Sequence, residues 1–158
     1  MSPRAAWRLE RLGFPRVYDY EAGKMDWLSY GLPHEGSALL AGDFVDRSVA
    51  TCDLDAPLAE AKRRVAEAGA GLCIAVTDGD VVMGIVRGAA LEGPDDQRVA
   101  DAMTFGVSTV RPSEDLEALT QRMAGANVEA IPVTSSDARL MGLLRREQAE
   151  EAIRQVRR

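Results

Sequence analysis

The sequence predicts a mixed α/β (α+β) fold in which two tandem β-α-β-β-α repeats follow an N-terminal helical arm. The first observation is an internal repeat, because residues 41–91 align without a gap on 99–149, and ten of the 51 pairs are identical. The second is that strand and helix signals follow the same order in both copies. When one unit is used twice, each copy covers the apolar face of the other. We therefore expect an arm over 1–36, a first repeat over 41–98 and a second over 99–156, with a cleft between the repeats.

The first repeat begins with a strand and a helix and continues as a hairpin. Asp55 can cap the helix, Pro57 is tolerated in its first turn, and Gly69 ends it. Asp78-Gly79 predicts a tight two-residue turn between two apolar, branched segments. The expected elements are a strand over 49–52, a helix from 55 to 69, strands over 72–77 and 81–86, and a short helical segment over 88–91.

The second repeat predicts the same order. Apolar residues recur at helical spacing from Leu116 to Met123, and Ser113 is placed to cap that helix. The expected elements are a strand over 108–110, the capped helix, strands over 129–134 and 139–144, and a final helix over 146–156.

The first 36 residues predict two helices, over 2–12 and 22–30, with a short strand over 17–18 between them. So small a set of elements cannot form a core alone. We therefore expect its aromatic side chains to be buried against the repeats or against a dimer partner, namely Trp7, Phe14, Tyr18 and Trp27. His34, the only histidine, is interpreted as a turn residue and not as a ligand or a base.

Composition excludes several classes of function. The net charge is −6 and lies entirely in residues 37–158, so the surface repels phosphate backbones and predicts no nucleic-acid binding. The sequence contains no leader and no run of about 18 apolar residues, so neither secretion nor membrane insertion is expected. Cys52 and Cys73 lack the spacing of a metal or redox pair, which favours two buried thiols in a reducing cytoplasm.

Four features of the second copy belong together: the strand that contains Thr109, the capped helix after it, the Ile131-Pro132-Val133 strand and the segment Arg139–Leu144. In this combination residues 41–156 resemble a pair of cystathionine-β-synthase-type (CBS) domains. The resemblance implies a module that binds an adenine nucleotide or related ligand between its repeats. It also implies a homodimer, and a regulatory role in place of catalysis.

The resemblance further implies where a ligand would bind. Ligand-binding members carry Thr or Ser three residues after the hairpin glycine, and six residues after it an Asp that accepts hydrogen bonds from the ribose hydroxyls. Here Gly84 is followed by Arg87 and Ala90, and Gly142 by Arg145 and Gln148, so both copies depart from this pattern. Gln148 can still bond a ribose hydroxyl, and Arg145 and Arg146 can face phosphates. The candidate ligand-binding residues are Thr109, Ala130, Pro132, Arg145 and Gln148 in the second copy, with Thr51 and Arg87 in the first.

These residues also have purely structural interpretations. Arg87 and Arg145 end equivalent strands, where they can be solvated or paired with neighbouring acids. Thr51 and Thr109 are good strand residues whether or not a ligand binds.

The arm has a resemblance of its own. The segments Arg4-Ala5-Ala6, Leu12-Gly13-Phe14, Val17–Tyr20 and Gly31-Leu32-Pro33 are similar to the closing third of a rhodanese-like domain, which follows the loop of the catalytic cysteine. Persulfide chemistry needs a thiolate of low pKa in a loop of backbone amides, and the sequence contains no such loop. We therefore expect no sulfurtransferase activity and no enzyme.

Two functions are compatible with these observations. The first is a non-catalytic sensor of CBS-pair type that binds AMP, ADP, ATP or S-adenosylmethionine, forms a homodimer and acts on an unknown regulated protein. The second is a structural or interaction module whose cleft binds no ligand.

Overall fold

The computed structural model describes residues 3–21, 23–30, 32–33, 39–69 and 71–156. Its fold is mixed α+β, as the sequence predicts. The elements are α1 (Pro3–Arg11), α2 (Gly23–Ser29), η1 (Ala41–Phe44), β1 (Thr51–Asp53), α3 (Leu58–Ala68), β2 (Leu72–Val76), β3 (Val82–Arg87), η2 (Gly88–Glu92), α4 (Val99–Ala102), β4 (Thr104–Phe105), α5 (Leu116–Gly125), β5 (Ala130–Thr134), β6 (Leu140–Arg145) and α6 (Arg146–Val156).

We call the part of the molecule that follows the arm, from residue 39 to 156, the body. Its strands form one sheet in each half. The first sheet has the order β1-β2-β3-β4, with β1 parallel to β2 and the other neighbours antiparallel. The second sheet is the β5-β6 hairpin, and a parallel bridge from Val110 to Val133 takes the place that β1 has in the first. The predicted strand over 108–110 is therefore reduced to this single bridge.

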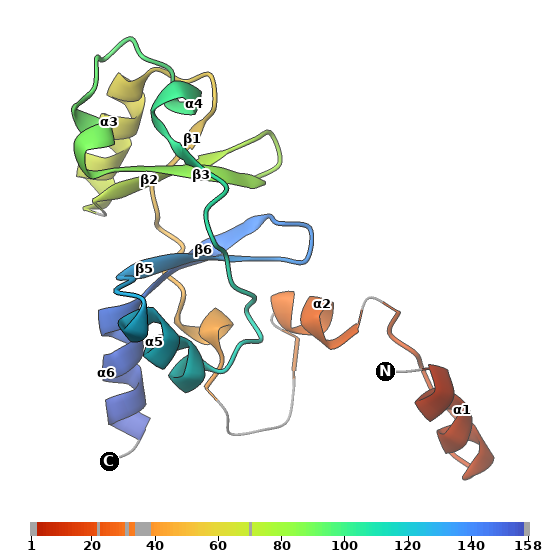
Figure 1. Ribbon diagram of the computed structural model, residues 1–158. Helices are drawn as coiled ribbons and strands as arrows, with labels where there is room; N and C mark the ends of the chain where they lie inside the picture. Colours follow the sequence, from red (N-terminus) through yellow and green to blue (C-terminus); the bar gives the residue numbers. More distant parts are fainter. Residues whose placement is uncertain (1–2, 22, 31, 34–38, 70, 157–158) are drawn as a thin grey trace.

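The two hairpins face each other in the middle of the body, with α3 and α4 on one outer side and α5 and α6 on the other (Figure 1). Each helical layer packs on its own sheet and forms an apolar core. A third core lies between the sheets and combines Ile74 and Ile85 of the first repeat with Leu143 of the second. The repeats are thus joined by buried apolar surface.

The segment that leads into each repeat pairs with the other repeat. We call residues 39–46 and 97–104 the leading segments. Three hydrogen bonds of 2.9 Å join the first of them to the second repeat: Ala41 N to Glu114 O, Gly42 N to Pro112 O, and Leu116 N to Leu39 O. The equivalent bonds join the second leading segment to the first repeat: Val99 N to Ala56 O, Ala100 N to Leu54 O, and Leu58 N to Gln97 O.

The repeated Met-Gly pair gives each leading segment room to approach its sheet. A Cβ atom at Gly84 would lie 2.6 Å from the carbonyl oxygen of Thr104, and one at Gly142 would lie 2.7 Å from that of Asp46. Thr104 pairs with Ile85, and Asp46 forms the equivalent bridge to Leu143. Glycine is required at both positions because a backbone atom occupies the space of a side chain.

Several local expectations were wrong. Asp55 does not cap α3: the N-cap is Pro57, without a side-chain bond, and Asp55 instead pairs with Arg98 at 3.3 Å. Ser113 is not the cap of α5 either, because the Asp115 side chain accepts from Ala118 N. The observed cap lies two residues beyond the expected one, where a carboxylate is available for the same bond.

The first hairpin turn is also longer than expected. Thr77 N donates to Val81 O and Asp80 N to Thr77 O, so the turn contains residues 78–80 and not two residues. Gly79 and Asp80 both adopt positive φ, at 97° and 64°. The extra residue lets the Asp80 carbonyl accept from Leu140 N, which joins the two hairpins at their tips.

The arm contains the two expected helices, but residues 16–20 form no strand. Its aromatic side chains are not buried within this chain: Trp7 is 57% exposed, Phe14 56%, Tyr18 78% and Trp27 36%. Their described contacts are local, since Arg11 lies 4.9 Å from the Trp7 ring and Trp27 Nε1 donates to Pro33 O. The helix α1, which carries Trp7, projects away from the body, so the core of the body does not cover that ring (Figure 1). His34 lies outside the described residues.

We expect Gly84→Ala to lower the free energy of unfolding by about 1–3 kcal/mol, because the new methyl group overlaps the Thr104 carbonyl. Urea denaturation measures this change. Gly125→Ala is the matched control, because it adds the same methyl group where no atom lies within 4 Å, and it should leave the stability unchanged or slightly raised. Equal effects of the two substitutions would contradict the close approach of the second leading segment.

Candidate functional site

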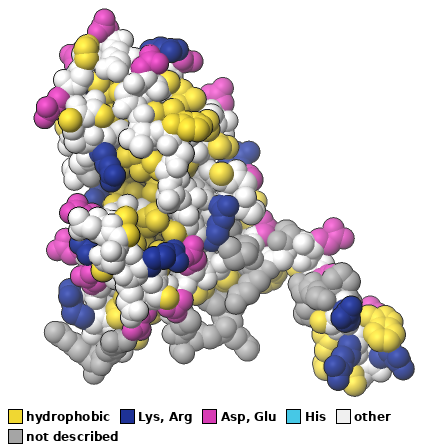
Figure 2. Space-filling view, viewed as in Figure 1, with side chains coloured by type: hydrophobic (Ala, Val, Ile, Leu, Met, Phe, Trp, Pro, Cys, Tyr) yellow, Lys and Arg dark blue, Asp and Glu magenta, His cyan; other side chains and the backbone are white. Residues whose placement is uncertain are grey.

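A cavity of about 330 Å³ opens between the two repeats. We call it the inter-repeat cavity. Three segments line it: the end of β3, the stretch from β4 toward Val110, and the entry into β5. The lining residues are Ile85, Arg87, Thr104, Gly106, Val107, Ser108, Val128, Ala130, Ile131 and Pro132. Hydrophobic side chains are visible between the two halves of the body in Figure 2.

The second leading segment and its continuation build one wall of this cavity. Thr104 pairs with Ile85 in the first sheet, and six residues later Val110 pairs with Val133 in the second. The chain therefore crosses from one repeat to the other between these two pairings. Gly106, Val107 and Ser108 lie on this crossing, which is why they line a space that belongs to both repeats.

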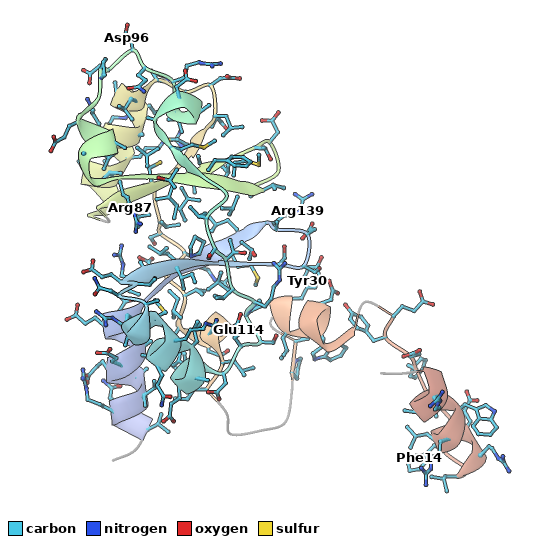
Figure 3. All side chains as sticks on the ribbon, viewed as in Figure 1. Phe14, Tyr30, Arg87, Asp96, Glu114 and Arg139 are labelled. Carbon is cyan, nitrogen blue, oxygen red and sulfur yellow. The ribbon has the colours of Figure 1, made fainter. Side chains whose placement is uncertain are left out.

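Arg87 supplies the only charged side chain among the described lining residues. It is the last residue of β3 and is exposed, and Figure 3 shows it at the space between the repeats. Within the described part of the chain its side chain has no hydrogen-bond or ion-pair partner. A guanidinium has five N–H donors, so a phosphate or carboxylate group in the cavity could accept from it.

Arg145, the equivalent residue of the second repeat, has different surroundings. It lines a separate cavity of about 470 Å³ together with Arg146 and three carboxylates, Glu129, Glu147 and Glu150. Glu129 occupies the position that Gly71 has in the first repeat. A carboxylate beside Arg145 competes with any anionic ligand, whereas Gly71 offers Arg87 no such partner. The two equivalent arginines thus have different charged surroundings, and Glu129 is one of the residues that make the difference.

The structure brings together three of the residues predicted from sequence, Arg87, Ala130 and Pro132. The others lie elsewhere. Thr109 accepts a hydrogen bond from Thr134 at 3.2 Å, and Thr134 in turn accepts one from Arg111 at 2.6 Å.

Thr51 lines a cavity of about 230 Å³ near the hairpin tips. Gln148 is exposed on α6. The ligand-binding role of all these residues stays a prediction.

The sequence analysis missed Thr104 and Ser108, the two hydroxyl side chains that line the inter-repeat cavity. Thr104 lies before the expected strand over 108–110 and Ser108 is the first residue of that strand, so the local sequence pattern gave no reason to select either. The internal repeat could have pointed to Thr104, because Thr104 is equivalent to Asp46 and both lie shortly before the first expected strand of their repeat.

The two cysteines lie on neighbouring strands and are buried in the core of the first repeat. A hydrogen bond with Cys52 and burial both raise the pKa of the Cys73 thiol. A thiol held in this way is a poor nucleophile at neutral pH. In the part of the chain that the structure describes, no three His, Cys, Asp or Glu side chains form a group that could hold a metal ion. None of the helices described is long and apolar enough to cross a bilayer.

Comparison with known proteins gives a consistent result. The family model of the CBS domain matches residues 41–88 and 99–155. No curated protein sequence matches the chain significantly. Many solved structures share its fold, at sequence identities that are too low to support more than the fold itself.

Three of these structures illustrate the likeness. The CBS-pair protein CBSX2 from Arabidopsis thaliana, crystallised with AMP, has a TM-score of 0.68 and 22% identity over 76% of this chain and 99% of its own. The CBS domain pair of protein MJ0100, crystallised with 5′-methylthioadenosine and S-adenosyl-L-methionine, has a TM-score of 0.65 and 16% identity over 76% of this chain and 99% of its own. The cytosolic domain of the Mg²⁺ channel MgtE, crystallised with ATP, has a TM-score of 0.65 and 20% identity over 72% of this chain and 48% of its own.

The present chain therefore spans about half the length of the magnesium-transporter chain that it matches. The two copies of the family model, the two sheets and the cavity between them lead to one assignment. The chain belongs to the CBS domain family, as a tandem pair of CBS domains.

Proposed function

We propose that this chain is a non-catalytic regulatory module that binds an adenine nucleotide in the inter-repeat cavity. The observation that carries the proposal is the environment of Arg87, which lines the cavity without a protein partner among the described residues. Related folds have been crystallised with AMP, with ATP and with S-adenosyl-L-methionine, which supports a ligand from the same group here.

The size and the lining of the cavity support such a ligand. Its volume of about 330 Å³ lies in the range of small-molecule sites. Ile85, Val107 and Ile131 offer apolar surface to an aromatic base. Arg87 would then donate to the phosphate at the edge of the cavity, where its charge stays solvated until the ligand arrives.

A ligand in this position would act on both repeats at once. The cavity is lined by the first sheet, by the second leading segment with its continuation, and by the second sheet, so a bound molecule contacts all three. Any ligand that binds only the native arrangement stabilises it. We propose that this stabilisation is the signal passed to a regulated protein.

Catalysis is not part of the proposal. Burial and the hydrogen bond with Cys52 raise the pKa of Cys73, which opposes the thiolate that sulfur transfer requires. The same hydrogen bond lowers the pKa of Cys52, but that side chain is buried in the core, where a sulfur donor cannot reach it. We retain the rhodanese resemblance of residues 1–36 as a proposal about the origin of the arm, and a cytoplasmic location as a proposal for the chain. Thiosulfate:cyanide transferase activity above that of a cysteine-free variant would contradict this view.

The exposed arm favours a second candidate, a protein-interaction module. Large apolar side chains of the arm are more than half exposed, among them Trp7, Phe14 and Tyr18. Exposed apolar surface of this kind marks sites of protein association. In this case the chain forms a homodimer or binds another protein through the arm, with or without a ligand in the cavity.

We expect AMP, ADP or ATP to stabilise the protein and Arg87→Ala to remove most of that effect. A nucleotide at 100 times its dissociation constant raises the free energy of unfolding by about 2.7 kcal/mol, which a thermal-shift panel including S-adenosylmethionine detects. Because a hydrogen bond to a charged group contributes about 1.5–3 kcal/mol, Arg87→Ala should weaken binding of the nucleotide about 10- to 100-fold in isothermal titration calorimetry.

The matched control is Arg145→Ala, which removes the same charge at the equivalent position outside the inter-repeat cavity. We expect it to change the affinity less than about threefold. A panel without any stabilising compound at millimolar concentration would leave the interaction module as the better account. Equal losses for the two variants would mean that Arg87 acts only through the net charge.

We expect the full chain to sediment as a species of twice the 17.1 kDa mass of one chain at micromolar concentration. The physical reason is that a second copy removes the exposed aromatic side chains of the arm from water, which lowers the free energy of the system. Replacement of both Trp7 and Phe14 by serine should shift the equilibrium toward the monomer. A mass near 17.1 kDa for the unaltered chain would exclude the homodimer.

A further inference from the structure

We infer that the inter-repeat cavity recognises the phosphate group and the base of its ligand but not the ribose hydroxyls, so that ribonucleotides and 2′-deoxyribonucleotides bind alike. The inference rests on the proposed function and concerns the selectivity of the same site.

The described lining contains no carboxylate that could accept from the hydroxyls of a ribose. Its polar side chains are one guanidinium, of Arg87, and two hydroxyls, of Thr104 and Ser108. A guanidinium only donates, so it matches the acceptor oxygens of a phosphate. The two neighbouring hydroxyls of a ribose are donors, and proteins that read them commonly use the carboxylate of Asp or Glu. The hydroxyls of Thr104 and Ser108 can also accept, but a bond between neutral groups is weaker than one to a carboxylate.

The carboxylate closest in sequence to this lining faces a different cavity. Val128 and Ala130 line the inter-repeat cavity, whereas Glu129 between them lines the cavity of Arg145 and Arg146. Glu129 lies at a bend immediately before β5, and there its side chain faces the other cavity. Arg146 N also donates to Glu129 O at 2.8 Å, which fixes the backbone at this point.

The helical turn that follows Arg87 supplies no acid to the cavity either. Ala90 and Leu91 of η2 are partly buried and pack on the core of the first repeat. Their apolar contacts hold η2 against that core. The charged recognition of a ligand in the described lining is therefore confined to Arg87, which would contact the phosphate.

Isothermal titration calorimetry with AMP, 2′-deoxy-AMP and adenosine tests this inference on the full chain, with ATP and 2′-deoxy-ATP as a second pair. We expect the dissociation constants of each ribose and deoxyribose pair to agree within about threefold, since the 2′-hydroxyl loses no charged partner. We expect adenosine to bind at least about tenfold more weakly than AMP, since it lacks the phosphate that Arg87 contacts.

The outcomes separate this inference from the proposed function. A 2′-deoxynucleotide that binds more than threefold more weakly than its ribonucleotide would overturn the inference and leave nucleotide binding intact. Adenosine that binds as tightly as AMP would overturn the role of the phosphate. No binding of any of the five compounds would overturn the proposed function together with the inference.

Glu129→Gln provides an independent control. The substitution keeps the size of the side chain and removes the charge that faces Arg145 and Arg146. Under the inference it leaves the affinities for AMP and 2′-deoxy-AMP unchanged within threefold. A selective loss of AMP affinity would show that Glu129 turns toward the ribose, and it would contradict the inference.

Discussion

The reciprocal pairing of the leading segments is the constraint on which the rest of this structure depends. Residues 39–46 bond to the second repeat and residues 97–104 to the first, through equivalent hydrogen bonds between 2.7 and 2.9 Å. Neither repeat therefore has its full set of backbone partners without a segment that precedes the other. Each such bond contributes about 1 kcal/mol, and the Ile74, Ile85 and Leu143 side chains add apolar contact between the sheets. The two repeats are expected to unfold as one cooperative unit.

The candidate site is a consequence of this exchange. A chain that leaves one sheet at Thr104 and joins the other at Val110 must cross the space between them, and the crossing forms a wall of the inter-repeat cavity. Pseudo-symmetry would by itself produce two equivalent sites. The charged residues break the equivalence, because three carboxylates, among them Glu129 at the position of Gly71, line the cavity of Arg145, whereas the described lining around Arg87 contains none. The charge pattern therefore favours anion binding at Arg87.

Much of the fold could be predicted because its signals are local and occur twice. The hairpins and the final helix over 146–156 follow from apolar periodicity, and the structure has that helix at the same bounds. The exchange could not be predicted, since a repeat shows that two units are alike and not which segment packs on which. Ser113 and Asp115 are both good caps, and α5 begins after Asp115, where the Asp115 cap coincides with the tertiary bond from Leu116 N to Leu39 O. Only part of the site could be predicted, because one wall of the cavity is formed by the chain that crosses between the sheets from Thr104 to Val110.

Native-state hydrogen exchange of individual amides tests the reciprocal pairing most directly. The informative amides are those that bond across the exchange, namely Ala41, Gly42, Leu58, Val99, Ala100 and Leu116. If neither repeat is complete alone, all six open only on global unfolding, and their free energies of exchange equal the free energy of unfolding measured by urea. Free energies that fall into two groups, one for each leading segment, with one group well below the global value, would show that a leading segment detaches independently and would contradict this account.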